Sequence, residues 1–150
     1  MIVTSPAEHG TDVTLGDEDG VAAIIRMSGS FAAAAARSRV AWLSRLRNWA
    51  AAGQRTVLWG SGSKAVAFLT TLGVHDEVEH VVDINPYRVG KFLPGTGQRI
   101  VAPAFLHEYR PDNVVIMNPV YRHEVERELA RQRCEPRVYT ILDLEPELSR

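Results

Sequence analysis

The sequence contains a single cysteine, Cys134, in a chain of 150 residues. One cysteine cannot form an intrachain disulfide bond or a zinc site made of several cysteines, and it fits a reducing compartment. The five histidines are not spaced as metal ligands are. The sequence therefore predicts neither a metal site nor a disulfide framework.

An excess of charge of either sign is also missing. Lys and Arg number 17 and Asp and Glu 18, which gives a formal net charge of -1. Such a chain has no overall positive field to attract nucleic acid or an acidic membrane. Hydrophobic residues make up 45% and charged residues 23%, an ordinary composition for one folded domain.

Long hydrophobic runs are absent as well. The small apolar stretch 31–36 is far shorter than the roughly 20 residues that cross a bilayer. Residues 1–20 contain no Lys or Arg, unlike the start of a signal peptide. From these absences we expect a cytoplasmic protein that binds neither membranes nor nucleic acid.

Residues 1–29 have the composition of a tail or of short strands, with Val21–Met27 as the strand candidate and Ser-Gly-Ser at 28–30 as a break. A connector helix is expected over residues 30–53, ending at a glycine. Its apolar residues recur at helical spacing, and two tryptophans widen the stripe: Val40, Trp42, Leu43, Leu46, Trp49 and Ala50.

From residue 54 to residue 150, short apolar runs alternate with helical patterns, which predicts an α/β fold whose mostly parallel sheet is covered by helices. The predicted strands are Thr56–Trp59, Glu79–Asp83, Arg99–Val101, Asn113–Met117 and Arg137–Leu142. The predicted helices are Ser63–Leu72, Ala104–Tyr109 and Tyr121–Gln132.

A glycine-rich turn follows the first of these strands. Residues 60–65 read Gly-Ser-Gly-Ser-Lys-Ala, so Gly60 allows a sharp turn and Gly62 allows a phosphate to approach the backbone. The next helix would direct its free amide groups toward an anion, and Lys64 would add positive charge. The same glycines also suit a tight turn that binds nothing.

Asp83 comes 83 − 60 = 23 residues after Gly60, close to the roughly 20 expected for a carboxylate that binds ribose hydroxyls. The same carboxylate could instead cap the Asn85-Pro86 turn. Further along, Lys91 is a candidate phosphate contact, and Phe92 is expected in the core.

Asn118 and Tyr121 follow a strand at the edge where open α/β sheets bind ligands, although Asn118 could equally cap the next helix. The complete set of candidate ligand-binding residues is Gly60, Gly62, Ser63, Lys64, Asp83, Asn85, Lys91, Asn118 and Tyr121. No catalytic residue is predicted.

Several stretches occur in a characteristic order. They are Leu-Trp-Gly-Ser-Gly-Ser-Lys at 58–64, Val-Asp-Ile-Asn-Pro at 82–86, Gly-Lys-Phe-Leu-Pro-Gly-Thr at 90–96, Arg-Pro-Asp at 110–112, and Met-Asn-Pro-Val-Tyr at 117–121 followed by Glu-Val at 124–125. Together they resemble the C-terminal domain of the S-adenosylmethionine-dependent C-methyltransferases that modify nucleotide-linked sugars.

That resemblance implies a Rossmann-like three-layer fold, preceded by the long helix, that helps to enclose a sugar nucleotide. In the family, a zinc-binding part and a methyl-donor domain precede this domain. The resemblance therefore implies that S-adenosylmethionine is bound elsewhere, with no cofactor assigned to this chain. The chain would be a fragment of a longer methyltransferase or a free-standing descendant.

Three other interpretations stay open. The chain could be an independent module that binds a nucleotide or a nucleotide sugar. It could be a structural domain that forms homo-oligomers through the helix carrying Trp42 and Trp49. NAD-dependent oxidoreduction is a weaker alternative, because no substrate domain accompanies the glycine turn.

Overall fold

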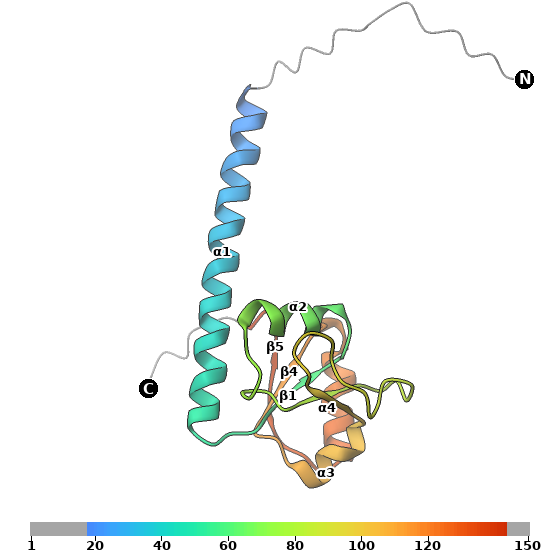
Figure 1. Cartoon of the computed structure of the whole chain (residues 1–150). Helices are drawn as coiled ribbons and strands as arrows, with labels where there is room; N and C mark the ends of the chain where they lie inside the picture. Colours follow the sequence, from blue (N-terminus) through green and yellow to red (C-terminus); the bar gives the residue numbers. More distant parts are fainter. Residues whose placement is uncertain (1–17, 144–150) are drawn as a thin grey trace, which may run out of the picture. The chain divides into compact units, whose positions relative to one another are not determined.

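The computed structural model describes residues 18–143, with side chains from Ala32 onward. Its contacts divide the chain into two units, residues 1–35 and residues 36–150. In the first unit, the described residues belong to helix α1, which runs from Glu18 to Ala51 (Figure 1).

The strand predicted at Val21–Met27 is wrong, because α1 already begins at Glu18 and passes through these residues and through the predicted break at 28–30. The reason is physical. A short apolar run without polar alternation fits a buried strand and a helix equally well. The rest of the predicted tail, residues 1–17, lies outside the described residues.

Five strands form one sheet in the order β3-β2-β1-β4-β5, and every neighbouring pair is parallel. The strands are β1 (Thr56–Trp59), β2 (His80–Val82), β3 (Arg99–Val101), β4 (Asn113–Ile116) and β5 (Arg137–Thr140). The helices that follow α1 are α2 (Ser63–Leu72), α3 (Leu106–Tyr109) and α4 (Arg122–Arg131), with 3-10 turns η1 (Pro103–Phe105) and η2 (Pro119–Tyr121). The predicted α/β Rossmann-like fold is confirmed.

Helices cover both faces of the sheet, and each face has its own core. One core joins α1 and α2 to the sheet through residues such as Leu46, Leu69 and Val115. The other joins α3 and α4 to the opposite face through Leu106, Val125 and the strand residues facing them. The central strands β1 and β4 are buried along their whole length, as strands of a covered parallel sheet must be.

Trp42 and Trp49 belong to the first of these cores, with exposed fractions of 2% and 7%. Their rings meet edge to face with centroids 6.4 Å apart, and the Trp42 Nε1 group donates a hydrogen bond to the Ile141 carbonyl at 3.1 Å. Both side chains are packed inside the domain, so neither is exposed for contact with another chain, and assembly through the helix that carries them stays a prediction.

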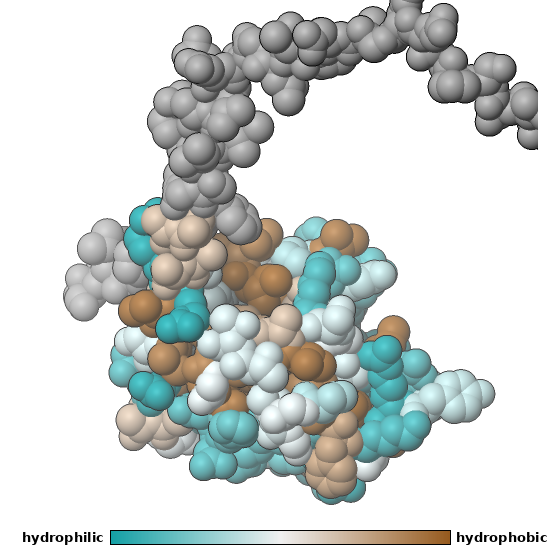
Figure 2. All heavy atoms as spheres, turned by 45° about the horizontal axis from the view of Figure 1, so that its top comes forward, coloured by the Kyte–Doolittle hydropathy of each residue, from teal (hydrophilic) through white to brown (hydrophobic). Residues whose placement is uncertain are grey.

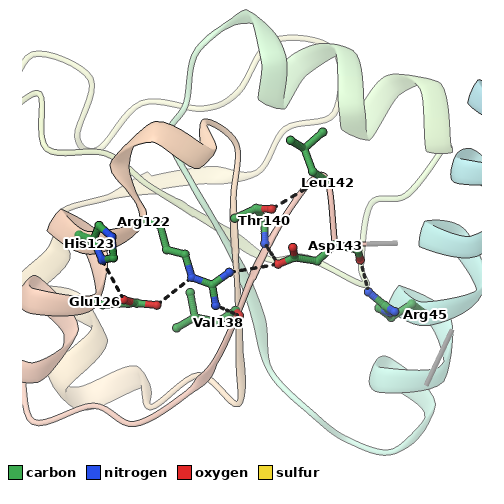
Figure 3. Close-up of polar contacts among 8 residues, drawn as sticks. All are labelled: Arg45, Arg122, His123, Glu126, Val138, Thr140, Leu142 and Asp143. Atoms are coloured by element: carbon green, nitrogen blue, oxygen red, sulfur yellow. Dashed lines mark hydrogen bonds and ion pairs between the residues drawn. The ribbon is translucent and has the colours of Figure 1, made fainter. Parts of the chain in front are cut away.

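The end of β5 is held by a polar network that joins three elements (Figure 3). Asp143 accepts a hydrogen bond from the Thr140 amide at 2.7 Å, and its carboxylate lies 3.4 Å from Arg122 Nη1 at the start of α4. Arg122 also donates from Nε to Glu126 at 2.9 Å, while Arg45 of α1 donates to the Asp143 carbonyl at 2.7 Å. These bonds fix the last strand against helices on both faces of the sheet.

Hydrophobic and hydrophilic side chains are interspersed on the face of the molecule drawn in Figure 2. Large exposed apolar side chains nevertheless follow β2 and β4, including Ile84, Tyr87, Val120 and Tyr121. Within residues 18–143, no helix combines the length and the apolar character that crossing a membrane requires.

Candidate functional site

The strand order creates a switch point at the carboxyl edge of the sheet. From β1 the chain runs through α2 to β2 and β3 on one side, and then returns to β4 on the other side of β1. The loops after β1 and β4 therefore diverge onto opposite faces and leave a crevice between them. In open α/β sheets, ligands bind in such a crevice.

The glycine turn lies at this point. Gly60 has φ +104, a conformation that a side chain would strain, and its amide donates to the Val82 carbonyl at 2.8 Å. Gly62 occupies the N-cap position of α2 without any side-chain cap, and Ser63 and Lys64 follow it as exposed residues. The first amides of a helix have no intrahelical acceptor, so this end of α2 offers donors to an anion.

Asp83 ties this turn to the loop after β2. One carboxylate oxygen accepts hydrogen bonds from the Ser61 hydroxyl and from the Ser61 amide, the latter at 3.0 Å. The other accepts from the Asn85 amide at 2.9 Å, so Asp83 does cap the Asn85-Pro86 turn. Burial alone would raise the pKa of Asp83, but these hydrogen bonds and nearby Arg88 outweigh it and lower the pKa.

Arg88 is a functional candidate that the sequence did not reveal. Its guanidinium Nη1 lies 3.6 Å from the Asp83 carboxylate and 3.3 Å from the Ser61 hydroxyl. The side chain is 46% exposed, so it brings positive charge to the glycine turn at the surface. Its position five residues after Asp83 gives no sequence signal, because the contact depends on how the loop after β2 folds back.

A cleft of about 510 Å³ opens beside the turn. Its walls are mainly apolar and come from the ends of β1, β2 and β4, from η2 and from α4. The lining residues are Trp59, Gly60, Asp83, Ile84, Ile116, Asn118, Tyr121, Glu124, Val125 and Glu128. A cleft of this size and apolar character, with a few polar groups on its walls, suits a small organic ligand.

Four of the candidate residues from the sequence line this cleft: Gly60, Asp83, Asn118 and Tyr121. Asn118 stands at the N-cap position of η2 but forms no capping hydrogen bond with its side chain. The alternative in which its side chain caps the next helix is therefore wrong, and its carboxamide is available to a ligand. Tyr121 is 55% exposed beside it.

The other candidates lie around the cleft and not in its wall. Gly62, Ser63 and Lys64 form the start of α2, and Asn85 lies in the turn that Asp83 caps. Lys91 is exposed on the loop between β2 and β3 and does not line the cleft. Phe92 is 63% exposed, so its expected place in the core is wrong. It forms an antiparallel bridge with Arg99 at the rim of the sheet.

Glu124 and Glu128 of α4 are further wall residues that sequence reasoning did not identify. Their charge pattern indicates only that they lie on the polar side of a helix. The structure turns this part of α4 toward the ends of β1 and β4, so both carboxylates reach the cleft. Among residues 18–143, no group of three or more His, Cys, Asp or Glu side chains is arranged to hold a metal ion.

Comparison with known proteins gives one family. Among solved structures, the chain is similar to one titled "Crystal structure of RSP in complex with beta-NADH", with 16% identity and a TM-score of 0.41 over 64% of this chain and 49% of that one. The chain thus spans about half the length of that protein. No curated protein matches it. The family described as "C-methyltransferase C-terminal domain" matches residues 16–137, which is most of the sequence and confirms the resemblance, and the chain therefore belongs to this family.

Proposed function

We propose that this chain is the substrate-enclosing part of an S-adenosylmethionine-dependent C-methyltransferase that acts on a nucleotide-linked sugar or a similar substrate. In this proposal the Rossmann-like domain is assigned to residues 54–150, of which the structure describes residues up to 143, and α1 connects it to the rest of the enzyme. The chain is not catalytic alone. Its role is to bind the nucleotide end of the substrate while a methyl-donor domain, or a separate chain, supplies the methyl group.

The observation that carries this proposal is the meeting of a glycine turn, a strand-end carboxylate and an apolar cleft at one switch point. A nucleoside diphosphate has matching parts. Its phosphates suit the first amides of α2, with Lys64 and Arg88 as the nearby cations. The flat aromatic faces of its base suit the mainly apolar cleft, which contains no Lys or Arg among its lining residues.

Ligand titration of the chain tests this directly. Calorimetry with nucleoside diphosphates, a nucleotide sugar and NAD is expected to detect binding of at least one nucleotide to the isolated chain. Failure of all of them to bind would contradict the proposal. Binding of NAD alone would favour a dinucleotide in place of a sugar nucleotide.

Lys64→Glu separates binding from folding. An acidic residue at the start of a helix is favoured by the helix dipole, so thermal stability should hold or rise slightly. Diphosphate affinity should fall about tenfold or more, because a charge-assisted contact is replaced by repulsion. Ala67→Glu, on the exposed side of the same helix, is the matched control and should keep the wild-type affinity. Equal diphosphate affinities for the two variants would show that Lys64 does not contact the ligand.

One observation favours a second candidate function. The Asp83 carboxylate already accepts three hydrogen bonds from its own chain, as a purely structural strand-end group would. In that case the domain serves assembly of a larger enzyme, and the glycine turn binds nothing. The same titration decides between the two, because only the binding role yields heat with a nucleotide.

A further inference from the structure

Strand β5 forms one edge of the sheet, and within residues 18–143 it pairs only with β4. An edge strand presents backbone amide and carbonyl groups that another strand can bind. The amides of Arg137 and Ile141 donate toward the chain segment that contains β4, at 2.9 and 3.2 Å. Alternate residues of a paired strand direct their backbone groups to opposite sides, so Val138 and Thr140 direct theirs outward.

Two charged side chains, Arg122 and Asp143, occupy this outward side of β5 (Figure 3). The Thr140 amide donates to the Asp143 carboxylate at 2.7 Å, and the Thr140 carbonyl accepts from the Asp143 amide at 3.0 Å. The Val138 carbonyl accepts from Arg122 Nη2 at 3.4 Å, while Arg122 Nη1 lies 3.4 Å from the same carboxylate. We call Arg122 and Asp143 the edge pair, because they take the positions at which a further strand would bind.

The edge pair covers a strand whose sequence favours pairing. Residues 137–142 read Arg-Val-Tyr-Thr-Ile-Leu, and β-branched and aromatic residues are the types enriched in strands. The side chains of Arg122 and Asp143 are 41% and 42% exposed, and an ion pair with this exposure contributes little to the free energy of unfolding. Its position across the edge of β5 therefore has a larger effect on association than its charge has on stability.

The opposite edge of the sheet, at β3, is covered by backbone. The Ile100 amide donates to the Lys91 carbonyl and the Ile100 carbonyl accepts from the Gly90 amide, both at 2.8 Å. Phe92 adds an antiparallel bridge with Arg99. Releasing the β3 edge requires a loop to detach, whereas releasing the β5 edge requires only that two side chains move.

From this arrangement we infer that the edge pair prevents β5 from pairing with β5 of a second copy of the chain. Two copies of β5 can meet antiparallel about a twofold axis, and each then supplies the donors and acceptors that the edge pair supplies here. Neither Arg122 nor Asp143 lines the cleft, so the inference is independent of nucleotide binding. It also implies that the rest of a methyltransferase attaches to helices or loops of this domain and does not extend its sheet.

Asp143→Ala tests the inference. It removes the acceptor of the Thr140 amide and the partner of Arg122, and it keeps the main-chain carbonyl that Arg45 binds. In sedimentation velocity, the mass of this variant should rise with concentration toward about twice that of the wild-type chain, as one twofold contact requires. Asp76→Ala, in the exposed turn before β2, removes the same charge and should behave as the wild-type chain does.

Hydrogen exchange at the Thr140 amide identifies the surface that associates. In dilute Asp143→Ala, this amide should exchange about tenfold or more faster than in the wild-type chain, because it loses a hydrogen bond to a charged acceptor. At concentrations where the variant associates, exchange should become slow again. Asp143→Asn keeps an acceptor oxygen without the charge, so it should show smaller changes in both mass and exchange.

Circular dichroism and thermal melting verify the folding of each variant. A wild-type mass for Asp143→Ala at every concentration would overturn the inference, as would association that leaves the Thr140 amide in fast exchange. If Asp143→Ala does not fold, the same two measurements on Asp143→Asn decide, and wild-type values for that variant would overturn the inference. Failure of nucleotides to bind would contradict the proposed function and leave the role of the edge pair standing.

Discussion

Gly60 fixes the geometry of the site at the scale of a single residue. Its φ of +104 turns the chain sharply after β1, and a β-carbon there would lie 3.7 Å from the Met117 side chain. Space is therefore sufficient, and the backbone conformation is what excludes other residues. Gly62, two residues later, has φ -77, and a β-carbon at this position would have no neighbour within 4 Å.

The two glycines should accordingly respond differently to alanine. Gly60→Ala is expected to lower the free energy of unfolding by about 1–3 kcal/mol, because it places a side chain in a strained region. Gly62→Ala should cost only about 0.5 kcal/mol, the difference between glycine and alanine at an N-cap. Chemical denaturation of both variants measures these values, and equal losses would show that the turn does not depend on the Gly60 conformation.

Sequence patterns identify the residues whose role depends on their own backbone conformation or on residues next to them in the sequence. The turn at residues 60–65 is predictable because glycine and helix-start chemistry are local. Arg88 and Glu124 are not, because their positions depend on how the loop after β2 folds back toward the glycine turn and on how α4 approaches the ends of β1 and β4. The prediction for Phe92 is wrong for the related reason that apolar character alone does not determine burial.

Among the elements, α1 anchors the domain through an arginine inserted between aromatic rings. The Arg45 guanidinium carbon lies 5.1, 5.9 and 5.5 Å from the ring centroids of Trp42, Trp49 and Tyr139. Arg45 Nη1 also donates to the Asp143 carbonyl beyond the end of β5 (Figure 3). A helix on one face and the last strand of the sheet are thereby joined by one side chain.

Arg45→Met should lower the free energy of unfolding by about 1–3 kcal/mol, since it retains most of the aliphatic stem but removes the cation–π contacts and the hydrogen bond. Arg47→Met, two residues away, loses an ion pair with Glu77 at 3.6 Å in which Arg47 is 61% exposed, and should cost less than about 0.5 kcal/mol. Urea unfolding of both variants provides the comparison. If both variants lost similar amounts of unfolding free energy, the aromatic cluster would attach α1 to the domain without a contribution from the Arg45 guanidinium.

The elements from β1 onward could be predicted almost to the residue. Thr56–Trp59, Ser63–Leu72 and Arg99–Val101 have the bounds expected from sequence. Glycines and prolines mark their ends, and the strands are short apolar runs of the kind found in covered parallel sheets. The start of α1 could not be predicted in this way, because Ser-Gly-Ser at 28–30 has the composition of a break and yet lies within a helix.

For the molecule as a whole, the sheet and its two helical layers place two ionisable groups at the ends of β2. His80 begins this strand beneath the rings of Phe105 and Tyr109, with ring centroids 4.7 and 4.9 Å away. Burial lowers the pKa of His80 below 6.5, with Arg99 acting in the same direction and Glu79 against it. Asp83, just after the strand, has a pKa below 3.8.

Both lowered pKa values make the domain less stable in acid, in two steps. The unfolded chain takes up a proton at His80 near pH 6.5 while the folded chain resists it, so the stability that neutral His80 provides is present above that pH and is lost as the pH falls through the folded pKa. Asp83 adds a second loss below about pH 4, where its carboxylate becomes protonated.

Melting temperatures measured from pH 7.5 to 3 should therefore decline first between about pH 7 and 5. His80→Gln should flatten that first decline and leave the second, whereas His123→Gln, at a side chain that is 90% exposed, should follow the wild-type curve. A His80→Gln curve that keeps the full first decline would assign the acid sensitivity to a different group.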